Sequence, residues 1–230
     1  MHADMPKLGK LPTIRRLPAY LRLLHDLRDA GQESVSGTYF AEQLKLDPVQ
    51  VRKDLTITGI VGKPRIGFSV CGLITAIEEY LGWNNSTEVF LVGVGHLGTA
   101  LLGYSGFTRH GLNIIAAFDT NPVKIGQEVH GKTVFALEKL PNLAQRLKVH
   151  IAIVTVPAVA VQSLADLLID AGITAIWNFT PAPLRVPAGI IVQNEDLSSG
   201  LAILCRRVRD ANAPHPPTLS LAADLAGEAE

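Results

Sequence analysis

The stretch VFLVGVGHLGTALL, from Val89 to Leu102, decides the fold of this chain. It starts with four apolar residues typical of a buried strand, and Gly93, Gly95 and Gly98 follow with the spacing G-x-G-x-x-G. This spacing turns a strand sharply into a helix, lets the backbone approach a pyrophosphate and directs a helix N-terminus at it. The stretch therefore predicts a dinucleotide-binding module that begins only after about eighty residues of other sequence.

Beyond this stretch, apolar runs alternate with helical patterns. The expected strands are continuously apolar rather than alternating, which favours a parallel sheet with both faces covered. A doubly wound parallel sheet of the Rossmann type is therefore the expected α/β fold over residues 84–196. The expected strands are 89–92, 114–118, 149–156, 175–179 and 190–193, and the expected helices reach 109, cover 137–147 and end at 171.

Asp119 ends the second expected strand, 21 residues past Gly98. An acid at this place suits hydrogen bonds from the hydroxyl groups of an adenosine ribose. It would repel a 2′-phosphate, so NADH and NAD⁺ are favoured over their phosphorylated forms. The alternative is that Asp119 only caps the turn that begins at Thr120.

Two more segments follow expected strands, at the edge where a doubly wound sheet binds ligands. Their apolar, proline-rich character suits a dry pocket for a nicotinamide ring, and burial in such a pocket favours the neutral reduced ring over the charged oxidised one. The residues expected to contact the cofactor are Gly93, Val94, Gly95, His96, Leu97, Gly98, Asp119, Thr120, Lys124, Thr155, Val156, Pro157, Asn178, Phe179 and Thr180.

A dehydrogenase would need a proton donor or base beside the ring. His96, Tyr104 and Lys124 are candidates, but none lies in a pattern that resembles a catalytic pair. The chain is also too short to hold a separate substrate domain beside the nucleotide fold. Binding without turnover is expected, and the alternative is an NAD-dependent oxidoreductase with an N-terminal interaction domain.

The N-terminal third has the pattern of a helix-turn-helix. Apolar residues recur every three or four positions over 12–30, and Pro18 interrupts them, so the regular helix is expected to start there. Ser36 can cap a second, shorter helix. Asp47 can cap a third, with Pro48 as its first residue.

This third is also basic, with eleven Lys and Arg against six Asp and Glu between residues 7 and 66. The third helix turns Gln50, Arg52, Lys53 and Thr56 outward, and a hairpin wing follows near 62–65. Cations, amides and hydroxyls on such a face suit DNA, whereas the alternative is a three-helix bundle with a basic, solvated face. The residues expected to contact double-stranded DNA are Ser36, Gln50, Arg52, Lys53, Lys63 and Arg65.

Composition limits the other kinds of site and the cellular compartment that this chain can be expected to have. The 230 residues carry no net charge and only two cysteines, Cys71 and Cys205, which lack metal-ligand spacing. We therefore expect no metal site, no disulfide and a reduced, cytoplasmic compartment. No signal segment or membrane span is expected. Residues 1–11 are expected to form a flexible arm and 211–230 a disordered tail, and the apolar helix over 197–210 must dock on its own domain or on a partner subunit.

Seven motifs together resemble one family, the Rex redox-sensing transcriptional repressors, over nearly all of residues 12–205. Their order along the chain makes the resemblance specific. The motifs are TIRRLPAYLRLL from Thr13, VRKDL from Val51, GVGHLGTALL from Gly93, AFDTNPVKIG from Ala117, TVPAVAVQSLADLLIDAGI from Thr155, WNFTPAPLRVP from Trp177 and EDLSSGL from Glu195.

The resemblance implies a homodimer whose winged-helix domains, here 12–83, bind a palindromic operator, and which NADH releases from DNA while NAD⁺ competes. It implies that the helix over 197–210 is exchanged between subunits. It also implies that Arg52 and Lys53 belong to the recognition helix and that Lys63 and Arg65 reach the minor groove.

Two further roles follow from the resemblance alone. It places Tyr104 near the nicotinamide, and it implies that Arg22 and Asp196 form an inter-domain ion pair in one ligation state.

Two departures concern the DNA-binding part. The family usually continues VRKDL with Ser-Tyr-Phe-Gly, whereas this chain has Thr56-Ile57-Thr58-Gly59. The wing usually has Arg-Gly where this chain has Pro64-Arg65-Ile66 before Gly67. A third hypothesis is therefore a Rex-like nucleotide-responsive protein with altered DNA binding.

Overall fold

The computed structural model describes residues 11–212. Contacts within the chain divide it into two compact units. The first unit runs to Val89 and includes Gly103–Ile115, and the second holds Phe90–Leu102 and the chain from Ala116 onward. The expected arm and tail lie almost wholly outside the described residues, although Leu11 already begins the first helix.

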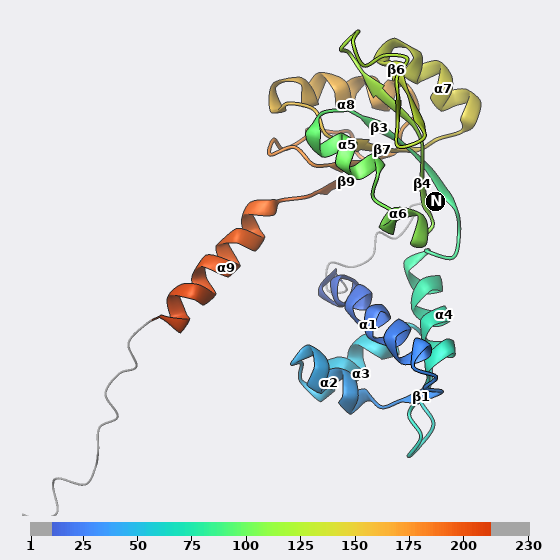
Figure 1. The fold of residues 1–230 in the computed structure, drawn as a ribbon, viewed down its shortest axis with the longest axis vertical. Coiled ribbons are helices and arrows are strands. Elements are labelled where there is room, and N and C mark those ends of the chain that lie inside the picture. Colours follow the sequence, from blue (N-terminus) through green and yellow to red (C-terminus); the bar gives the residue numbers. More distant parts are fainter. Residues whose placement is uncertain (1–10, 213–230) are drawn as a thin grey trace, which may run out of the picture. The chain divides into compact units, whose positions relative to one another are not determined.

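The first unit is a helical domain with a small two-stranded sheet (Figure 1). Its core joins residues of α1 to α4, among them Leu17, Phe40, Val51 and Leu73. Its elements are α1 (Leu11–Asp29), β1 (Ser34–Val35), α2 (Gly37–Leu44), α3 (Pro48–Thr56), β2 (Phe68–Ser69), α4 (Val70–Leu81) and the short α6 (Gly106–Arg109).

The helix-turn-helix forms through the expected caps. The hydroxyl of Ser36 accepts a hydrogen bond from the Tyr39 N–H, and the carboxylate of Asp47 accepts from Val49 and Gln50. Between the two helices, Lys45 adopts the left-handed conformation that ends α2. These local bonds satisfy N–H groups that a helix start leaves free, which is why the sequence alone located both starts.

The prediction that the first helix becomes regular only at Pro18 was wrong, because α1 runs through Pro18 from Leu11. Proline removes one hydrogen bond from a helix interior, and this helix tolerates the loss. Leu17 and Leu21, which flank Pro18, are almost fully buried. Packing of this apolar stripe therefore outweighs the local penalty.

The wing is a tight turn rather than a regular hairpin. Lys63 and Gly67 exchange backbone hydrogen bonds of 2.7 and 2.9 Å across it. The returning strand β2 pairs antiparallel with β1, which precedes α2. A Cβ on Gly67 would lie 2.3 Å from the Val35 carbonyl oxygen, so the close crossing of these two strands requires glycine.

In the second unit, the described strands form a seven-stranded sheet with the order β5-β6-β4-β3-β7-β8-β9. The pairs β4–β6, β7–β8 and β8–β9 are parallel, as expected for a doubly wound sheet. The strands are β3 (Thr87–Val92), β4 (Leu112–Asp119), β5 (Glu128–Val129), β6 (Lys132–Ala136), β7 (Ile151–Val154), β8 (Ala175–Asn178) and β9 (Ile191–Asn194).

Helices connect these strands, and one more follows the last strand (Figure 1). They are α5 (His96–Leu102), η2 (Leu137–Lys139), α7 (Leu140–Leu147), η3 (Ala158–Ala160), α8 (Val161–Asp170) and α9 (Leu197–Ala211). The single helix expected to reach residue 109 is in fact two, because the chain leaves the helical conformation between α5 and α6. The turn there brings Gly106 against Tyr104, whose ring a Cβ on Gly106 would meet at 2.3 Å.

The hairpin β5–β6 was missed by the sequence analysis. Two residues with positive φ, His130 at 49° and Gly131 at 74°, connect its antiparallel strands. Positive φ at both turn residues is the geometry of a type I′ hairpin. Glycine in second place was an available signal, but the strands were too short to recognise.

The helix α9 matches the expected terminal helix. Its apolar side chains have no cover within the described chain: Leu201, Ile203, Leu204 and Val208 are each more than half exposed. Asp196 caps the helix by accepting from the Ser198 N–H. Exposed apolar residues on one helix are typical of a docking surface, and the exchange of this helix between subunits stays a prediction.

Candidate functional site

The three glycines of the loop after β3 have different surroundings, and each suits a separate role in holding a pyrophosphate. Gly93 has a φ of +99°, so it makes the sharp turn out of the strand. A Cβ on Gly98 would lie 2.0 Å from the Gly93 carbonyl oxygen, so α5 packs closely on the loop only with glycine there. A Cβ on Gly95 would meet nothing within 4 Å. The open side of the loop therefore lies at Gly95, where a phosphate can approach the backbone.

Neighbouring strands hold this loop in place. The Gly93 N–H donates to the Phe118 carbonyl at the end of β4, over 2.8 Å. On the other side, the Thr155 hydroxyl donates to the carbonyl of Gly93 over 2.6 Å. The loop is thus fixed from both sides at the carboxyl edge of the sheet, at the switch point where strand order changes direction and dinucleotides bind.

Asp119 lies beside the loop and is held by donors. Its carboxylate accepts from the backbone N–H groups of Val94 and Asn121, each at 2.8 Å, and from the ammonium of Lys124 at 3.2 Å. Burial alone would raise the pKa of Asp119, but these donors outweigh it and lower that pKa. A carboxylate offers about four acceptor positions, so Asp119 keeps capacity for a ribose hydroxyl.

A cavity of about 470 Å³ opens at this edge of the sheet. It brings together eight of the residues predicted at the cofactor: Gly93, Gly95, Asp119, Thr120, Lys124, Thr155, Val156 and Pro157. It is also lined by Val92, Leu137, Ala160, Ser163 and Leu164, of which sequence reasoning named none. Val92 ends the predicted strand β3, and Leu137 follows the unrecognised strand β6. The other three lie on η3 and α8, where the sequence carries only a helical pattern.

A shallower depression of about 400 Å³ lies on the outer side of the glycine loop. Val94, Gly95, His96, Thr99 and Lys124 line it. Val94 and Gly98 are buried, whereas His96 and Leu97 are exposed. The predicted loop residues thus divide into those that build the loop and those that face out from it.

The structure does not bring the segment after β8 into the 470 Å³ cavity. The Asn178 amide is fully buried, donates to Asn194 and Ala182, and accepts from the N–H and hydroxyl of Thr180. The Phe179 ring packs against Trp177 at 5.1 Å. In this structure Asn178 and Thr180 hold the chain together after β8, so their contact with a cofactor stays a prediction.

Three other predicted positions are tested only in their local surroundings. Tyr104 is 57% exposed and packs edge to face on Phe107 at 5.0 Å. Arg22 is exposed on α1. Asp196 caps α9 by accepting from the N–H and hydroxyl of Ser198, which lower its pKa. The roles of Tyr104 at the nicotinamide and of Arg22 with Asp196 stay predictions.

In the first unit, α3 has the expected outward face with one exception. Arg52, Lys53 and Thr56 are exposed, while Leu55 is buried against the core. Gln50, predicted to face DNA, is only half exposed, and its amide donates to the Asp54 carboxylate over 2.8 Å. Its side chain amide is therefore engaged within the domain.

Asp54 itself was missed as an organising residue. Its carboxylate is fully buried and accepts from Arg16 at 2.6 and 2.7 Å, from Thr13 at 2.8 Å and from Tyr20 at 3.1 Å. Burial would raise the pKa of Asp54, but the hydrogen bonds from Arg16, Gln50 and Thr13 outweigh it and lower that pKa. This cluster fixes α3 against α1, and an acid between apolar positions 51 and 55 was the available signal.

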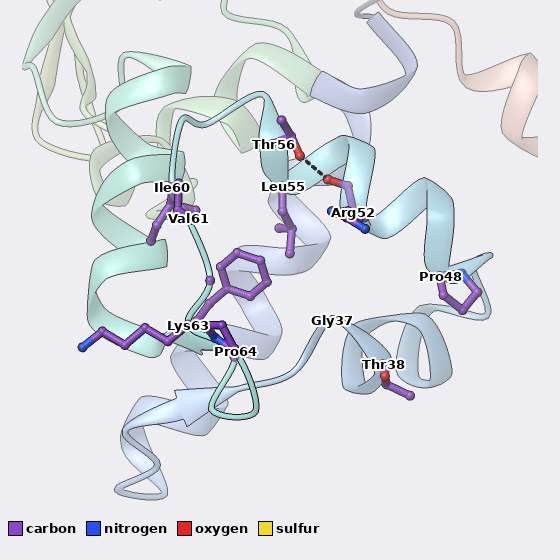
Figure 2. Close-up of a pocket in the computed structure, with 13 residues that line it drawn as sticks. Gly37, Thr38, Pro48, Arg52, Leu55, Thr56, Ile60, Val61, Lys63 and Pro64 are labelled. Atoms are coloured by element: carbon purple, nitrogen blue, oxygen red, sulfur yellow. Dashed lines mark hydrogen bonds between the residues drawn. The ribbon is translucent and has the colours of Figure 1, made fainter.

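A groove of about 520 Å³ separates α3 from the wing (Figure 2). Arg52, Leu55 and Thr56 lie on its α3 side, and Val61 and Lys63 lie on the wing side (Figure 2). At the tip of the wing, Arg65 has a φ of +64°, directly after Pro64. Cations on both sides of a groove beside a recognition helix suit a nucleic-acid backbone.

No group of three or more His, Cys, Asp or Glu within residues 11–212 could hold a metal ion. No described helix is long and apolar enough to cross a membrane. Both cysteines are free and exposed.

Two family models match the chain. One, described as a CoA binding domain, matches residues 84–182, and the other, described as the N-terminus of a putative DNA-binding protein, matches residues 11–56. The matched ranges correspond to the sheet with its glycine loop and to the first three helices. Together they support a nucleotide-binding part preceded by a DNA-binding part.

Curated relatives cover most of the chain. The redox-sensing transcriptional repressor Rex of Treponema denticola is 52% identical over 198 residues, which are 86% of this chain and 94% of the relative. The protein of the same name from Bacteroides fragilis is 41% identical over 207 residues, which are 90% of this chain and 94% of the relative. The similarity thus extends over both units.

Solved structures agree with this similarity over the whole fold. RSP, a Rex-family repressor, has a TM-score of 0.80 at 30% identity, covering 91% of this chain and 96% of that one. RSP in complex with β-NAD⁺ and operator DNA has a TM-score of 0.82 at 31% identity, covering 91% and 95%. The resemblance of the seven motifs is confirmed: the chain belongs to the Rex family of redox-sensing transcriptional repressors.

Proposed function

We propose that this protein is a homodimeric repressor that binds a palindromic operator when NADH is scarce and leaves it when NADH binds. The observation that carries the proposal is the environment of the glycine loop. Gly95 is open to the cavity, and Asp119 stands beside the loop with acceptor capacity to spare. These groups suit the pyrophosphate and the ribose of NADH or NAD⁺.

Solved structures of a relative support the binding of both NADH and NAD⁺. Crystal structures of RSP contain β-NADH in one case and β-NAD⁺ with operator DNA in another. In this chain, Gly93, Gly95, Gly98 and Asp119 would hold the cofactor. Arg52 and Lys53 would contact the operator in the major groove, and the wing would contribute a further cation.

Control of DNA binding by NADH requires linkage. NADH must bind the DNA-incompetent arrangement better than the competent one, and operator DNA must weaken NADH binding by the same factor. A coupling free energy of about 1–3 kcal/mol would change operator affinity by about 5- to 150-fold. The exposed apolar side chains of α9 support the exchange of this helix between subunits, which would join two such switches in one dimer.

The experiment is a titration of a labelled palindromic duplex, followed by fluorescence anisotropy. NADH is added to the complex, and then NAD⁺ in a separate series. We expect NADH to release the DNA and NAD⁺ to do so far less. Equal release by both nucleotides would contradict redox sensing, and the absence of operator binding would contradict the repressor function as a whole.

We also propose that the protein is not an enzyme. The curated relatives are named as transcriptional repressors. Beside the glycine loop, the cavity presents only Asp119 and Lys124 as ionisable groups, and they pair with each other. Steady oxidation of NADH with added carbonyl compounds would instead support an oxidoreductase. A repressor acts on DNA, so we place the protein in the cytoplasm.

A further inference from the structure

Beyond Pro48, the outward face of α3 carries one exposed apolar residue. Val49, the second residue of the helix, is 60% exposed. Arg52, Lys53 and Thr56 follow three, four and seven positions later, so they share its face of the helix, and all three are exposed. Val49 therefore lies at the N-terminal end of a polar, cationic stripe on the recognition helix.

This position is where a helix-turn-helix protein contacts bases, because the N-terminal residues of its recognition helix approach base edges in the major groove. Backbone N–H groups cannot serve that purpose here. Asp47 already accepts hydrogen bonds from the N–H groups of Val49 and Gln50, at 2.8 and 3.3 Å. The Gln50 amide is turned toward the domain, since it donates to Asp54. Of this first turn, the Pro48 and Val49 side chains are exposed, and Pro48 lines the groove between α3 and the wing.

The wing also carries exposed apolar residues. Val61 is 86% exposed and Ile66 60%, and both lie in the segment of the wing. In the described part of the first unit, the large hydrophobic residues that are exposed are Leu11, Val49, Val61, Ile66 and Tyr104. Val61 lines the groove beside α3 together with Arg52, so apolar and cationic side chains both lie at this groove.

We propose that Val49 is a specificity-determining residue that contacts the C5-methyl group of a thymine in each half of the operator. The thymine methyl is the apolar group that base pairs present in the major groove, and small apolar side chains recognise it. Arg52, on the same face one turn further along the helix, would contact the neighbouring base pairs. The inference rests on the proposed operator binding and names a determinant of its specificity.

The test removes the methyl group alone. A palindromic duplex is selected by the protein from random DNA, and each thymine of the half-site is replaced in turn by deoxyuridine, symmetrically in both halves. Pairing is unchanged, so any loss of affinity reports the methyl. We expect one position at which affinity falls about fourfold per half-site, or about 15-fold for the duplex, as for one buried methyl-sized group.

The same series is repeated with Val49→Ser and with Val61→Ser, an equally conservative change at another exposed valine. Val49→Ser should bind the thymine and deoxyuridine duplexes equally, whereas Val61→Ser should keep the penalty of the wild type. Methyl dependence that is absent in the wild type, or unchanged in Val49→Ser, would overturn this inference while leaving the repressor function intact. Failure to select any duplex would overturn both.

Discussion

At the scale of single residues, Asp54 shows how a buried charge can define a DNA-binding domain. Its carboxylate is fully buried and accepts hydrogen bonds from side chains of α1, including both donors of the Arg16 fork. It also accepts from Gln50 on its own helix. A buried carboxylate without these partners would be very costly, so the cluster holds only when α1 and α3 meet in one register.

We expect Asp54→Asn to lower the free energy of unfolding by about 2–3 kcal/mol, because it leaves the Arg16 guanidinium facing a neutral group. The control is Asp29→Asn, which breaks the exposed pair with Arg28 and should cost less than about 0.5 kcal/mol. Urea unfolding of both variants at neutral pH measures the difference. Equal stability of the two variants would contradict the assigned role.

The lowered pKa of Asp54 also predicts a dependence on pH. A carboxyl whose pKa is lower in the folded state stabilises the fold above its unfolded pKa and loses that contribution as pH falls through the folded value. The wild type should therefore lose stability below about pH 4, and Asp54→Asn should lose less over the same range.

At the scale of elements, the glycine loop and the wing each depend on backbone conformation. In the loop, the two outer glycines are confined by neighbouring backbone, and Gly95 is not. In the wing, the Ile66 N–H donates to the Lys63 carbonyl, Pro64 occupies the next position and Arg65 has positive φ. This is the geometry of a type II turn, which favours glycine where Arg65 lies.

Two alanine variants separate the roles of the loop glycines. Gly98→Ala should disrupt the loop, because its Cβ would lie 2.0 Å from a backbone oxygen, and we expect a loss of several kcal/mol in stability. Gly95→Ala should keep the stability of the wild type, since its Cβ has free space, but should bind NADH at least tenfold more weakly. Thermal unfolding and NADH titration test the pair. If Gly95→Ala bound NADH with the affinity of the wild type, the pyrophosphate could not bind on this side of the loop.

In the wing, we expect Arg65→Gly to stabilise the domain by about 1 kcal/mol, because glycine adopts the left-handed conformation without strain. It should also weaken operator binding. The slope of operator affinity against salt concentration, on logarithmic scales, should fall by about one for each wing, because each wing loses one phosphate contact. Lys148→Gly is the matched control, because Lys148 has a φ of +53° and ends α7 in the other unit. It should gain similar stability and leave DNA binding unchanged. If the two variants bound the operator equally well, the Arg65 cation would have no part in DNA binding.

At the scale of the whole molecule, the proposed function requires a dimer, and α9 is the element that would join it. We expect Leu204→Asp to convert the dimer into a monomer, because it places a charge in the exposed apolar stripe that a partner would bury. The stripe consists of Leu201, Leu204 and Val208. Ser199→Asp, on the side of the helix opposite these three residues, should remain dimeric. Sedimentation equilibrium distinguishes the two outcomes, and a dimeric Leu204→Asp would exclude this stripe as the interface.

Much of the architecture could be predicted from local chemistry. Ser36 and Asp47 located the helix starts, because a cap needs only its own N–H neighbours. The residues that line the cavity could be predicted only in part. Leu137 and Ser163 come from segments far from the glycine loop in the sequence, and no local pattern marks their approach.

The sequence by itself determined that a glycine-turned strand follows a basic helix-turn-helix, since periodicity, caps and turn residues act over a few neighbouring positions. Only the tertiary structure decided which side chains those elements present. It turned Gln50 inward to Asp54 and left Val49 outward, and it closed Gly98 against the loop while leaving Gly95 open. The physical reason is that burial and hydrogen-bond partners depend on segments distant in sequence, which meet only when the chain is packed.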